Sequence, residues 1–267
     1  MWAAVMTLPK LALDTEIFQN TKVGDDVYAL TVHGGALVNQ AQPGQFIHLQ
    51  IPAENVFLRR PFGIADTDEG NGRLTMYYRV AGKGTRALTG LQHGDTVNCL
   101  GPLGNGFSLS SKRPLLVGGG MGLAPLLLLT KRFQGKADVL MGGRNQAELF
   151  WKDIFEPYAH EIFITTDDGS LGVRGFTTDL LPELLGQRKY DCIYTCGPEI
   201  MMRGIAKIAA QHDIPCQVSL EKRMACGLGA CLSCVCDTAN GERKKICKDG
   251  PVFRAQDVFF AKKKGIL

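Results

Sequence analysis

The stretch "PLLVGGGMGLAPLLLL", Pro114 to Leu129, decides the fold class. A short apolar strand runs into a cluster of glycines, and an apolar helical segment follows. As far as about Glu221, further apolar runs such as "ADVLMGG" and "EIFITT" alternate with helical stretches. Strands that alternate with helices predict right-handed βαβ units around a parallel sheet.

The glycine turn inside this stretch is a candidate nucleotide site. Glycines let a pyrophosphate approach the backbone, and the start of the following helix favours its negative charge. The G-x-G-x-x-G fingerprint fails, however, because Leu123 or Pro125 stands where the last glycine should be. No acidic residue stands at a strand end about 20 residues later, as that fingerprint requires. A tight strand–helix turn without a ligand therefore remains an alternative.

Two other strand ends strengthen the nucleotide interpretation. They are "TTDDGSLG", residues 165 to 172, and "TCGP", residues 195 to 198. In an open α/β sheet a ligand lies outside the carboxyl ends of the strands. Arg144 could meet a 2′-phosphate or be a surface arginine, so the residues alone do not choose between NAD and NADP. The candidate nucleotide-binding residues are Gly118, Gly119, Gly120, Gly122, Asp167, Cys196, Gly197 and Pro198.

Upstream of the glycine turn, the chain from Leu11 to about Leu103 has a different texture. The runs "VYALTV", "QFIHLQI" and "RLTMYYRV" are separated by glycine-rich turns and predict a small β-barrel. Within it, Arg60 beside Pro61 offers a guanidinium on a rigid backbone that could grip a phosphate. Gly84 and Thr85 open a short helix and form a second candidate anion site. Turn chemistry with surface arginines is the alternative for both.

Downstream, the segment "MACGLGACLSCVC", Met224 to Cys236, is rich in cysteine. The spacing C-x4-C-x2-C, with a fourth cysteine after twelve further residues, is that of plant-type [2Fe–2S] proteins. Structural zinc prefers paired C-x2-C knuckles, and only one such pair is present, so zinc and plain buried thiols are the weaker alternatives. Cys236 is interpreted as a buried thiol, and Cys99, Cys192 and Cys216 as core residues. The predicted metal ligands are Cys226, Cys231, Cys234 and Cys247.

The overall composition excludes several classes of protein. The 267 residues are 45% hydrophobic and carry a net charge of +4, without a basic run interleaved with aromatics, so we expect no nucleic-acid partner. No apolar stretch is long enough for a membrane span. Nine cysteines, an odd number, and an N-terminus without a signal-peptide pattern predict a cytoplasmic protein without disulfides.

Taken together, the barrel with "RRPFG" and "GKGT", the α/β segment with "GGGMGLAP" and "CGP", and the plant-type cysteines resemble the ferredoxin-NADP reductase superfamily. Within it, "EKRMACGLGACLSC" followed by "CKDGPVF" is similar to the electron-transfer subunits of NAD-dependent dihydroorotate dehydrogenases of pyrimidine biosynthesis. The resemblance implies an oxidoreductase subunit with FAD, a [2Fe–2S] cluster and NAD. This chain departs from the family pattern at Gly63, where the family often carries a hydroxyl residue near the flavin. The FAD-binding residues that the resemblance implies are Arg60, Pro61, Phe62, Gly63, Tyr77, Tyr78, Arg79, Gly84 and Thr85.

The resemblance also implies how the chain is organised and with what it works. The expected domains are an FAD-binding β-barrel at 11–103, an NAD-binding α/β domain at 104–221 and a [2Fe–2S] domain at 222–267. The expected partner is an FMN-containing dihydroorotate dehydrogenase catalytic subunit, in a heterotetramer of two of each. Electrons would pass from FMN through the cluster and FAD to NAD⁺, with a polar-poor contact face around residues 226–250 and no catalytic side chain in this chain. The alternatives are the small subunit of a related NAD(P)H:ferredoxin or sulfide-linked flavoprotein, and a zinc-stabilised binding module.

Overall fold

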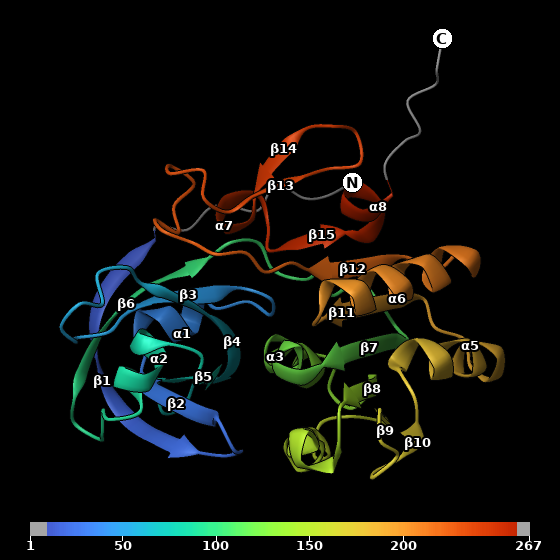
Figure 1. Ribbon diagram of the computed structural model, residues 1–267, viewed down its shortest axis with the longest axis horizontal. Helices are drawn as coiled ribbons and strands as arrows, with labels where there is room; N and C mark the ends of the chain where they lie inside the picture. The colour runs from blue at the N-terminus through green and yellow to red at the C-terminus, as the bar shows by residue number, and fades with distance from the viewer. Residues whose placement is uncertain (1–9, 261–267) are drawn as a thin grey trace.

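The computed structural model describes residues 10–260 and divides them between a barrel, a sheet covered by helices and a C-terminal segment that lies above both (Figure 1). The expectation for the N-terminus lies outside the described part, as do the last residues of the predicted [2Fe–2S] domain at 222–267. Within residues 10–260 no helix is long and apolar enough to cross a membrane. All nine cysteines are free thiols.

The predicted barrel is confirmed as a closed, antiparallel barrel of six strands in the order β1-β2-β5-β4-β3-β6. Side chains of β5 alternate, so that Leu74, Met76 and Tyr78 point inward and their neighbours outward, as strand geometry requires. The helices α1 and α2 occupy connections between strands. The bounds are β1 Leu11–Lys22, β2 Val27–His33, α1 Ala36–Gln40, β3 Phe46–Gln50, β4 Arg60–Asp68, β5 Arg73–Arg79, α2 Lys83–Leu88 and β6 Thr96–Leu103.

The predicted α/β domain contains a seven-stranded sheet in the order β10-β9-β8-β7-β11-β12-β15. All neighbouring strands are parallel except β12 and β15. Every residue of β7 is buried, as expected for a strand covered by helices on both faces. The bounds are β7 Pro114–Gly119, α3 Ala124–Arg132, β8 Asp138–Gly143, α4 Trp151–Phe155, β9 Glu161–Thr166, β10 Val173–Arg174, α5 Thr177–Gln187, β11 Cys192–Cys196, α6 Glu199–Gln211 and β12 Cys216–Ser219. Two 3-10 turns, Gly120–Leu123 and Gln146–Leu149, follow β7 and precede α4.

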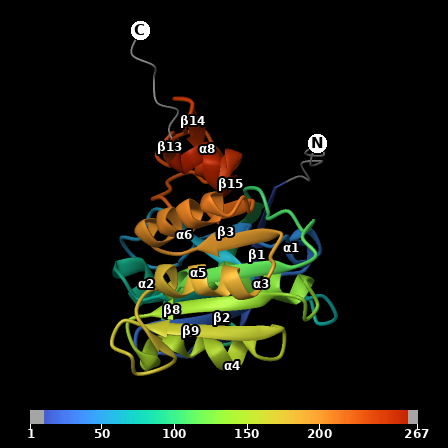
Figure 2. The same cartoon turned by 90° about the vertical axis from the view of Figure 1, so that its right-hand side faces the viewer.

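Helix α3 fixes the barrel against the sheet, and Figure 1 shows it between the two. Leu128 on α3 is buried with the barrel core, whereas most of the helix is buried with the core of the α/β domain. At the start of the same helix, Pro125 lies against Gly63 of β4, 3.4 Å from where a Cβ of Gly63 would stand. The other face of the sheet carries α5 and α6, which lie in front of the strands in Figure 2. The two domains therefore share buried contacts.

The C-terminal segment is built from short elements and is joined to both domains. Its third strand, β15, pairs antiparallel with β12 and extends the sheet. One hydrophobic cluster contains Leu103 of the barrel, Met202 of α6, Val218 of β12 and Cys247 of the segment. The bounds are β13 Val235–Asp237, β14 Arg243–Lys245, α7 Ile246–Asp249, β15 Val252–Arg254 and α8 Ala255–Phe259. The segment is thus a third layer packed on the other two.

Candidate functional site

A cavity of about 1190 Å³ lies at the carboxyl ends of β7, β8, β9 and β11. Its far wall comes from the C-terminal segment, through Val235, Cys236 and Asp237 on β13 and Phe259 on α8. The barrel contributes Arg79. The cavity is therefore bounded by all three parts of the chain and lies where open α/β sheets bind ligands.

Most of the predicted nucleotide residues meet at this cavity. Six of them line it: Gly119, Gly120, Gly122, Asp167, Gly197 and Pro198. Gly118 and Cys196 lie behind the lining, where they pair with each other across β7 and β11. Burial raises the pKa of the Cys196 thiol, so this group stays protonated at neutral pH. A buried neutral thiol can pack and position its neighbours but is not a ready nucleophile.

The glycine turn is shaped by a close backbone approach. A Cβ on Gly122 would stand 2.3 Å from the carbonyl oxygen of Cys196 and 2.5 Å from Cα of Gly197. Gly120 has a φ of +55°, which favours glycine, and no atom lies within 4 Å of its Cβ position. The turn after β7 therefore lies directly against the turn after β11, and their backbones form one floor of the cavity.

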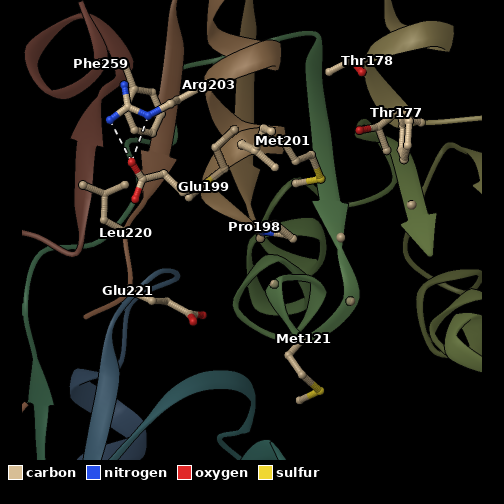
Figure 3. A pocket seen from close by; sticks show the side chains of 18 of the residues that line it. Met121, Thr177, Thr178, Pro198, Glu199, Met201, Arg203, Leu220, Glu221 and Phe259 are labelled. Carbon is tan, nitrogen blue, oxygen red and sulfur yellow. Dashed lines mark hydrogen bonds and ion pairs between the residues drawn. The ribbon is translucent and has the colours of Figure 1, made fainter. Parts of the chain in front are cut away.

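Four acidic residues that line the cavity were not predicted: Glu148, Glu199, Glu221 and Asp237. Glu221 follows β12, and its carboxyl group extends into the cavity (Figure 3); the surrounding protein raises its pKa by desolvation, although the residue as a whole is solvent-exposed. Glu148 lies near the end of β8 and is engaged by Arg144 and Arg79. The position of Glu221 directly after a buried strand was a usable signal. The sequence around Glu148 gives no comparable signal, because Glu148 reaches the cavity only through the 3-10 turn at Gln146–Leu149.

The C-terminal wall of the cavity is held by a cation–aromatic contact. Arg203 on α6 lies over the ring of Phe259 on α8, with Cζ 4.6 Å from the ring centroid. Its Nη2 is 2.8 Å from a carboxylate oxygen of Glu199, one turn away on the same helix (Figure 3). These contacts attach α8 to α6 and close this side of the cavity.

On the barrel, the two predicted anion sites come together. The guanidinium of Arg60 lies over Gly84, with Nε 3.1 Å from where a Cβ of that glycine would stand. The hydroxyl of Thr85 accepts hydrogen bonds from the backbone N–H groups of Ala81, at 2.9 Å, and Gly82, at 3.2 Å. A side chain at position 84 would therefore press against the Arg60 guanidinium. The absence of one lets the guanidinium lie directly beside the turn, so that both could contact the same phosphate group.

The predicted aromatic residues of the barrel divide between two faces. Tyr78 is buried inside the barrel and donates a hydrogen bond to the Asn20 side chain at 3.0 Å, and burial raises the pKa of Tyr78 to about 12. Phe62 also points inward, 5.7 Å from the ring of Tyr78. Tyr77 points outward and packs against Trp151 of α4 at 4.8 Å. Phe62 and Tyr78 could therefore contact a ligand on the outer face of the barrel only through their backbone atoms.

The four predicted cysteine ligands form two pairs. Cys226 Sγ accepts hydrogen bonds from the N–H of Leu228, at 3.3 Å, and of Cys231, at 3.5 Å. Cys234 Sγ accepts from the N–H of Cys247 at 3.4 Å. Among residues 10–260 no group of three or more His, Cys, Asp or Glu side chains stands close enough to share one metal ion.

The chemistry of this loop suits thiolate sulfur. The Ser233 hydroxyl and nearby backbone N–H groups lower the pKa of Cys231 to about 6, whereas burial raises the pKa of Cys247 to about 12. Gly227 and Gly229 have φ values of +71° and +83°, which let the backbone wrap tightly around the sulfurs. Donors directed at sulfur and small residues around it are what an iron–sulfur cluster requires, so the residues present fit one.

The cysteine loop lies directly on the barrel. A Cβ on Gly227 would stand 2.6 Å from Nδ1 of His48, a fully buried residue of β3. Neither ring nitrogen of His48 meets a hydrogen-bond partner. Burial, with the charge of Arg59 nearby, lowers the pKa of His48 to about 4, so the ring is neutral at physiological pH. Because His48 faces Pro61 across β3 and β4, it stands between the candidate flavin strand and the cysteine loop.

Two known protein families match two of the three parts of the chain. Residues 14–107 match the oxidoreductase FAD-binding domain family, and residues 221–259 match the iron-sulfur cluster binding domain of dihydroorotate dehydrogenase B. With the barrel, sheet and cavity, these matches define a flavin-dependent oxidoreductase of the ferredoxin-reductase-like class with an iron–sulfur binding domain.

Full-length relatives narrow this class. The chain is 41% identical over 246 residues to the dihydroorotate dehydrogenase B (NAD(+)) electron transfer subunit of Bacillus caldolyticus, covering 88% of this chain and 94% of the relative. It is 37% identical over 253 residues to that of Caldanaerobacter subterraneus subsp. tengcongensis, covering 93% and 98%. The chain belongs to the family of electron transfer subunits of dihydroorotate dehydrogenase B.

A solved structure supports the same architecture. A chain from the structure of an NADH-dependent reduced ferredoxin-NADP oxidoreductase, described in terms of flavin-based electron bifurcation, superposes with a TM-score of 0.82. The two are 32% identical, and the match covers 91% of this chain and 89% of that one. A ferredoxin NADP+ reductase from Neisseria gonorrhoeae, at 15% identity and a TM-score of 0.61, shares the fold alone.

Proposed function

We propose that this chain carries electrons from an FMN-containing catalytic subunit, through a [2Fe–2S] cluster and FAD, to NAD⁺ in pyrimidine biosynthesis. FAD can exchange two electrons with a nicotinamide or one with an iron–sulfur cluster, which is the conversion that such a relay needs. Oxidation of dihydroorotate to orotate on the partner releases two electrons and two protons, and NAD⁺ takes up both electrons and one proton as NADH.

The observation that carries this proposal is the position of the cysteine segment. Its Gly227 lies on His48 of the barrel, beside the strand proposed for the flavin. Its strand β13 forms a wall of the cavity proposed for the nucleotide. A cluster held on Cys226, Cys231, Cys234 and Cys247 would therefore adjoin both other cofactors. The two cysteine pairs suit the two irons of a [2Fe–2S] cluster, one pair for each iron.

The chain's own residues would hold FAD and orient NAD⁺. We assign the FAD phosphates to Arg60 and to the turn at Gly84 and Thr85, with the flavin along β4 and β5. NAD⁺ would lie in the cavity, its pyrophosphate on the glycine turn after β7, where backbone N–H groups bind anions. No side chain has to act as a nucleophile or base, because the cofactors carry the reaction.

The partner would dock on the face that carries the cluster loop. Cys231 is exposed, and the large apolar side chains Leu228 and Leu232 beside it are 47% and 61% exposed. An apolar rim around a cluster ligand is expected where a protein partner must approach closely. We propose a heterotetramer of two subunits of each kind, located in the cytoplasm, where reducing conditions preserve free thiols.

The predicted domain bounds, 11–103, 104–221 and 222–267, remain part of this proposal. The last part contributes β15 to the sheet of the second, so we expect it to depend on that sheet for folding. A chain truncated before residue 222 would expose the edge of β12 and open the wall of the cavity.

A second candidate function is the small subunit of a related NAD(P)H:ferredoxin oxidoreductase. The similarity to the NADH-dependent reduced ferredoxin-NADP oxidoreductase structure favours it. The partner separates the two candidates: an FMN protein that oxidises dihydroorotate, or a second flavin–iron–sulfur protein.

The test is a cofactor and partner analysis of protein purified without oxygen from cells that also produce its natural partners. We expect FAD, about two irons and two sulfides per chain, bleaching of the flavin by NADH, and co-purification of an FMN protein that oxidises dihydroorotate. FMN alone in the isolated chain, zinc in place of iron, or a partner without FMN would contradict the proposal.

A further inference from the structure

The end of β8 carries an arginine that is paired with a nearby carboxylate. Arg144 follows β8 directly, and its guanidinium is bonded to the Glu148 carboxylate through Nη2 and through Nε at 2.8 Å. The second oxygen of Glu148 accepts the backbone N–H of Arg144 at 2.9 Å. Both carboxylate oxygens therefore accept from Arg144, one from the guanidinium and one from the backbone, while most of the Arg144 side chain remains exposed.

This pair lies where the nucleotide's adenosine ribose is expected, an inference that rests on the proposed function. The strand β8 neighbours β7, whose glycine turn would hold the pyrophosphate. In dinucleotide-binding sheets, the residues at the end of this next strand meet the ribose, and an acid there favours NAD whereas a free arginine accommodates the 2′-phosphate of NADP. Arg144 and Glu148 both line the cavity.

The surrounding charges favour a ribose diol over a phosphate. Asp167, at the end of β9, also lines the cavity and interacts electrostatically with Arg144. Its backbone N–H donates to Gly143 at 3.1 Å, which ties the two strand ends together. Arg79 of the barrel lies 3.7 Å from Glu148, so a single carboxylate faces both guanidinium groups. A 2′-phosphate bound at Arg144 would lie beside the Glu148 carboxylate, which has the same sign of charge and opposes it, whereas ribose hydroxyls can donate to these carboxylates.

We propose that Glu148 is the specificity-determining residue that makes the site select NAD over NADP, because it occupies Arg144 and presents a carboxylate to the ribose. Sequence alone left Arg144 as a candidate partner for a 2′-phosphate. In the folded chain it serves instead to hold Glu148 in place. The dinucleotide that this site takes is therefore the one with a free 2′-hydroxyl.

The test uses two probes that differ only by the phosphate: AMP and adenosine 2′,5′-bisphosphate. Their dissociation constants are measured by calorimetry on the FAD- and iron-loaded protein, beside kcat/KM for NADH and NADPH with an artificial electron acceptor. In the Glu148→Gln variant the affinity for the bisphosphate relative to AMP should rise about tenfold, the gain expected when one charge-assisted hydrogen bond to phosphate becomes available. The NADPH-to-NADH ratio of kcat/KM should rise with it.

Two further variants make the result specific. Adding Arg144→Gln to Glu148→Gln should remove most of the gain, because Arg144 is hydrogen-bonded to Glu148 whereas Arg79 lies farther from it, at 3.7 Å. Glu156→Gln, the same charge change on an exposed residue after α4 and away from the cavity, should change neither probe. Unaltered FAD content and far-ultraviolet circular dichroism identify folded variants.

The outcomes separate this inference from the proposed function. If Glu148→Gln leaves the bisphosphate-to-AMP ratio unchanged, or the native protein uses NADPH as well as NADH, Glu148 does not set the specificity, while nucleotide-linked flavin reduction still stands. If neither nucleotide reduces the flavin of the native protein, the proposed function itself fails.

Discussion

Replacing Gly122 by alanine tests the packing of the nucleotide turn. The new Cβ would stand 2.3 Å from the carbonyl oxygen of Cys196, about 1 Å short of ordinary contact. The atoms that it meets belong to the backbone at the end of β11, which is hydrogen-bonded into the sheet and cannot turn aside as a flexible side chain would. The turns after β7 and β11 must therefore separate.

The cost follows from overpacking a rigid site. Such substitutions destabilise by about 1–3 kcal/mol, and backbone neighbours place this one near the upper end, at about 3 kcal/mol. For a chain of this size we expect the unfolding midpoint to fall by roughly 5–10 °C. The affinity for AMP should also fall, since the displaced turn is part of the floor of the cavity.

Two other glycines supply the controls. Gly186 lies in α5 with no atom within 4 Å of its Cβ position, so Gly186→Ala should stabilise the protein by about 0.5–1 kcal/mol. Gly120 has open space but a φ of +55°, so Gly120→Ala should cost only about 1 kcal/mol of backbone strain. Thermal unfolding and calorimetric titration with AMP measure all three. A Gly122→Ala protein with unchanged midpoint and affinity would refute the reasoning.

Three further predictions concern other parts of the chain. Because burial lowers the pKa of His48 from 6.5 to about 4, the unfolded chain binds a proton between these values that the folded chain does not, and the folded state loses stability as the pH falls through this window. The stability of His48→Leu relative to the native protein should therefore rise by about 2 kcal/mol when the pH is lowered from 7 to 5. Urea unfolding at both pH values measures this change. If the difference in stability between the two proteins is the same at both pH values, His48 is not the titrating group. Cys236→Ser should retain its iron whereas Cys231→Ser should lose it, and iron loss in the Cys236 variant would overturn the ligand set. Asp138 lies at the opposite end of β8 from the cavity and accepts a hydrogen bond from the Tyr190 hydroxyl at 2.7 Å. Asp138→Asn should lower the stability by about 2 kcal/mol without altering the affinity for AMP. A loss of AMP affinity as large as the loss of stability would contradict the view that Asp138 serves folding and not the nucleotide site.

Local patterns in the sequence were sufficient for most of the fold. The barrel strands alternate with period two, and the strand of the glycine turn is continuously apolar, so both could be predicted without knowledge of their partners. The strand β15 could not, because it has three residues and exists through its pairing with β12, more than thirty residues earlier. The extension of the sheet by the cysteine segment is for the same reason a property of the folded chain.

The candidate site likewise contains residues that the sequence predicts and residues that only the folded structure reveals. The glycines, the "CGP" turn and Asp167 could be predicted because parallel strands bring their carboxyl ends to one edge. Glu148 was missed because the sequence shows no strand end there, and only the 3-10 turn at Gln146–Leu149 returns it to Arg144. The inward orientation of Tyr78 follows from the register of β5, which the sequence alone leaves open.

The central claim, that the cysteine segment relays electrons between the partner and the nucleotide site, is tested most directly by the Cys231→Ser variant in complex with the catalytic subunit. The measurement is NADH formation from dihydroorotate and NAD⁺, beside NADH oxidation with an artificial acceptor. We expect the first activity to disappear and the second to persist, because the proposed flavin strands and the glycine turn belong to the barrel and the sheet, and Arg79 of the barrel lines the cavity directly. If the cluster-free chain, still folded, still loaded with FAD and still bound to its partner, formed NADH from dihydroorotate at the native rate, the relay would not pass through these cysteines.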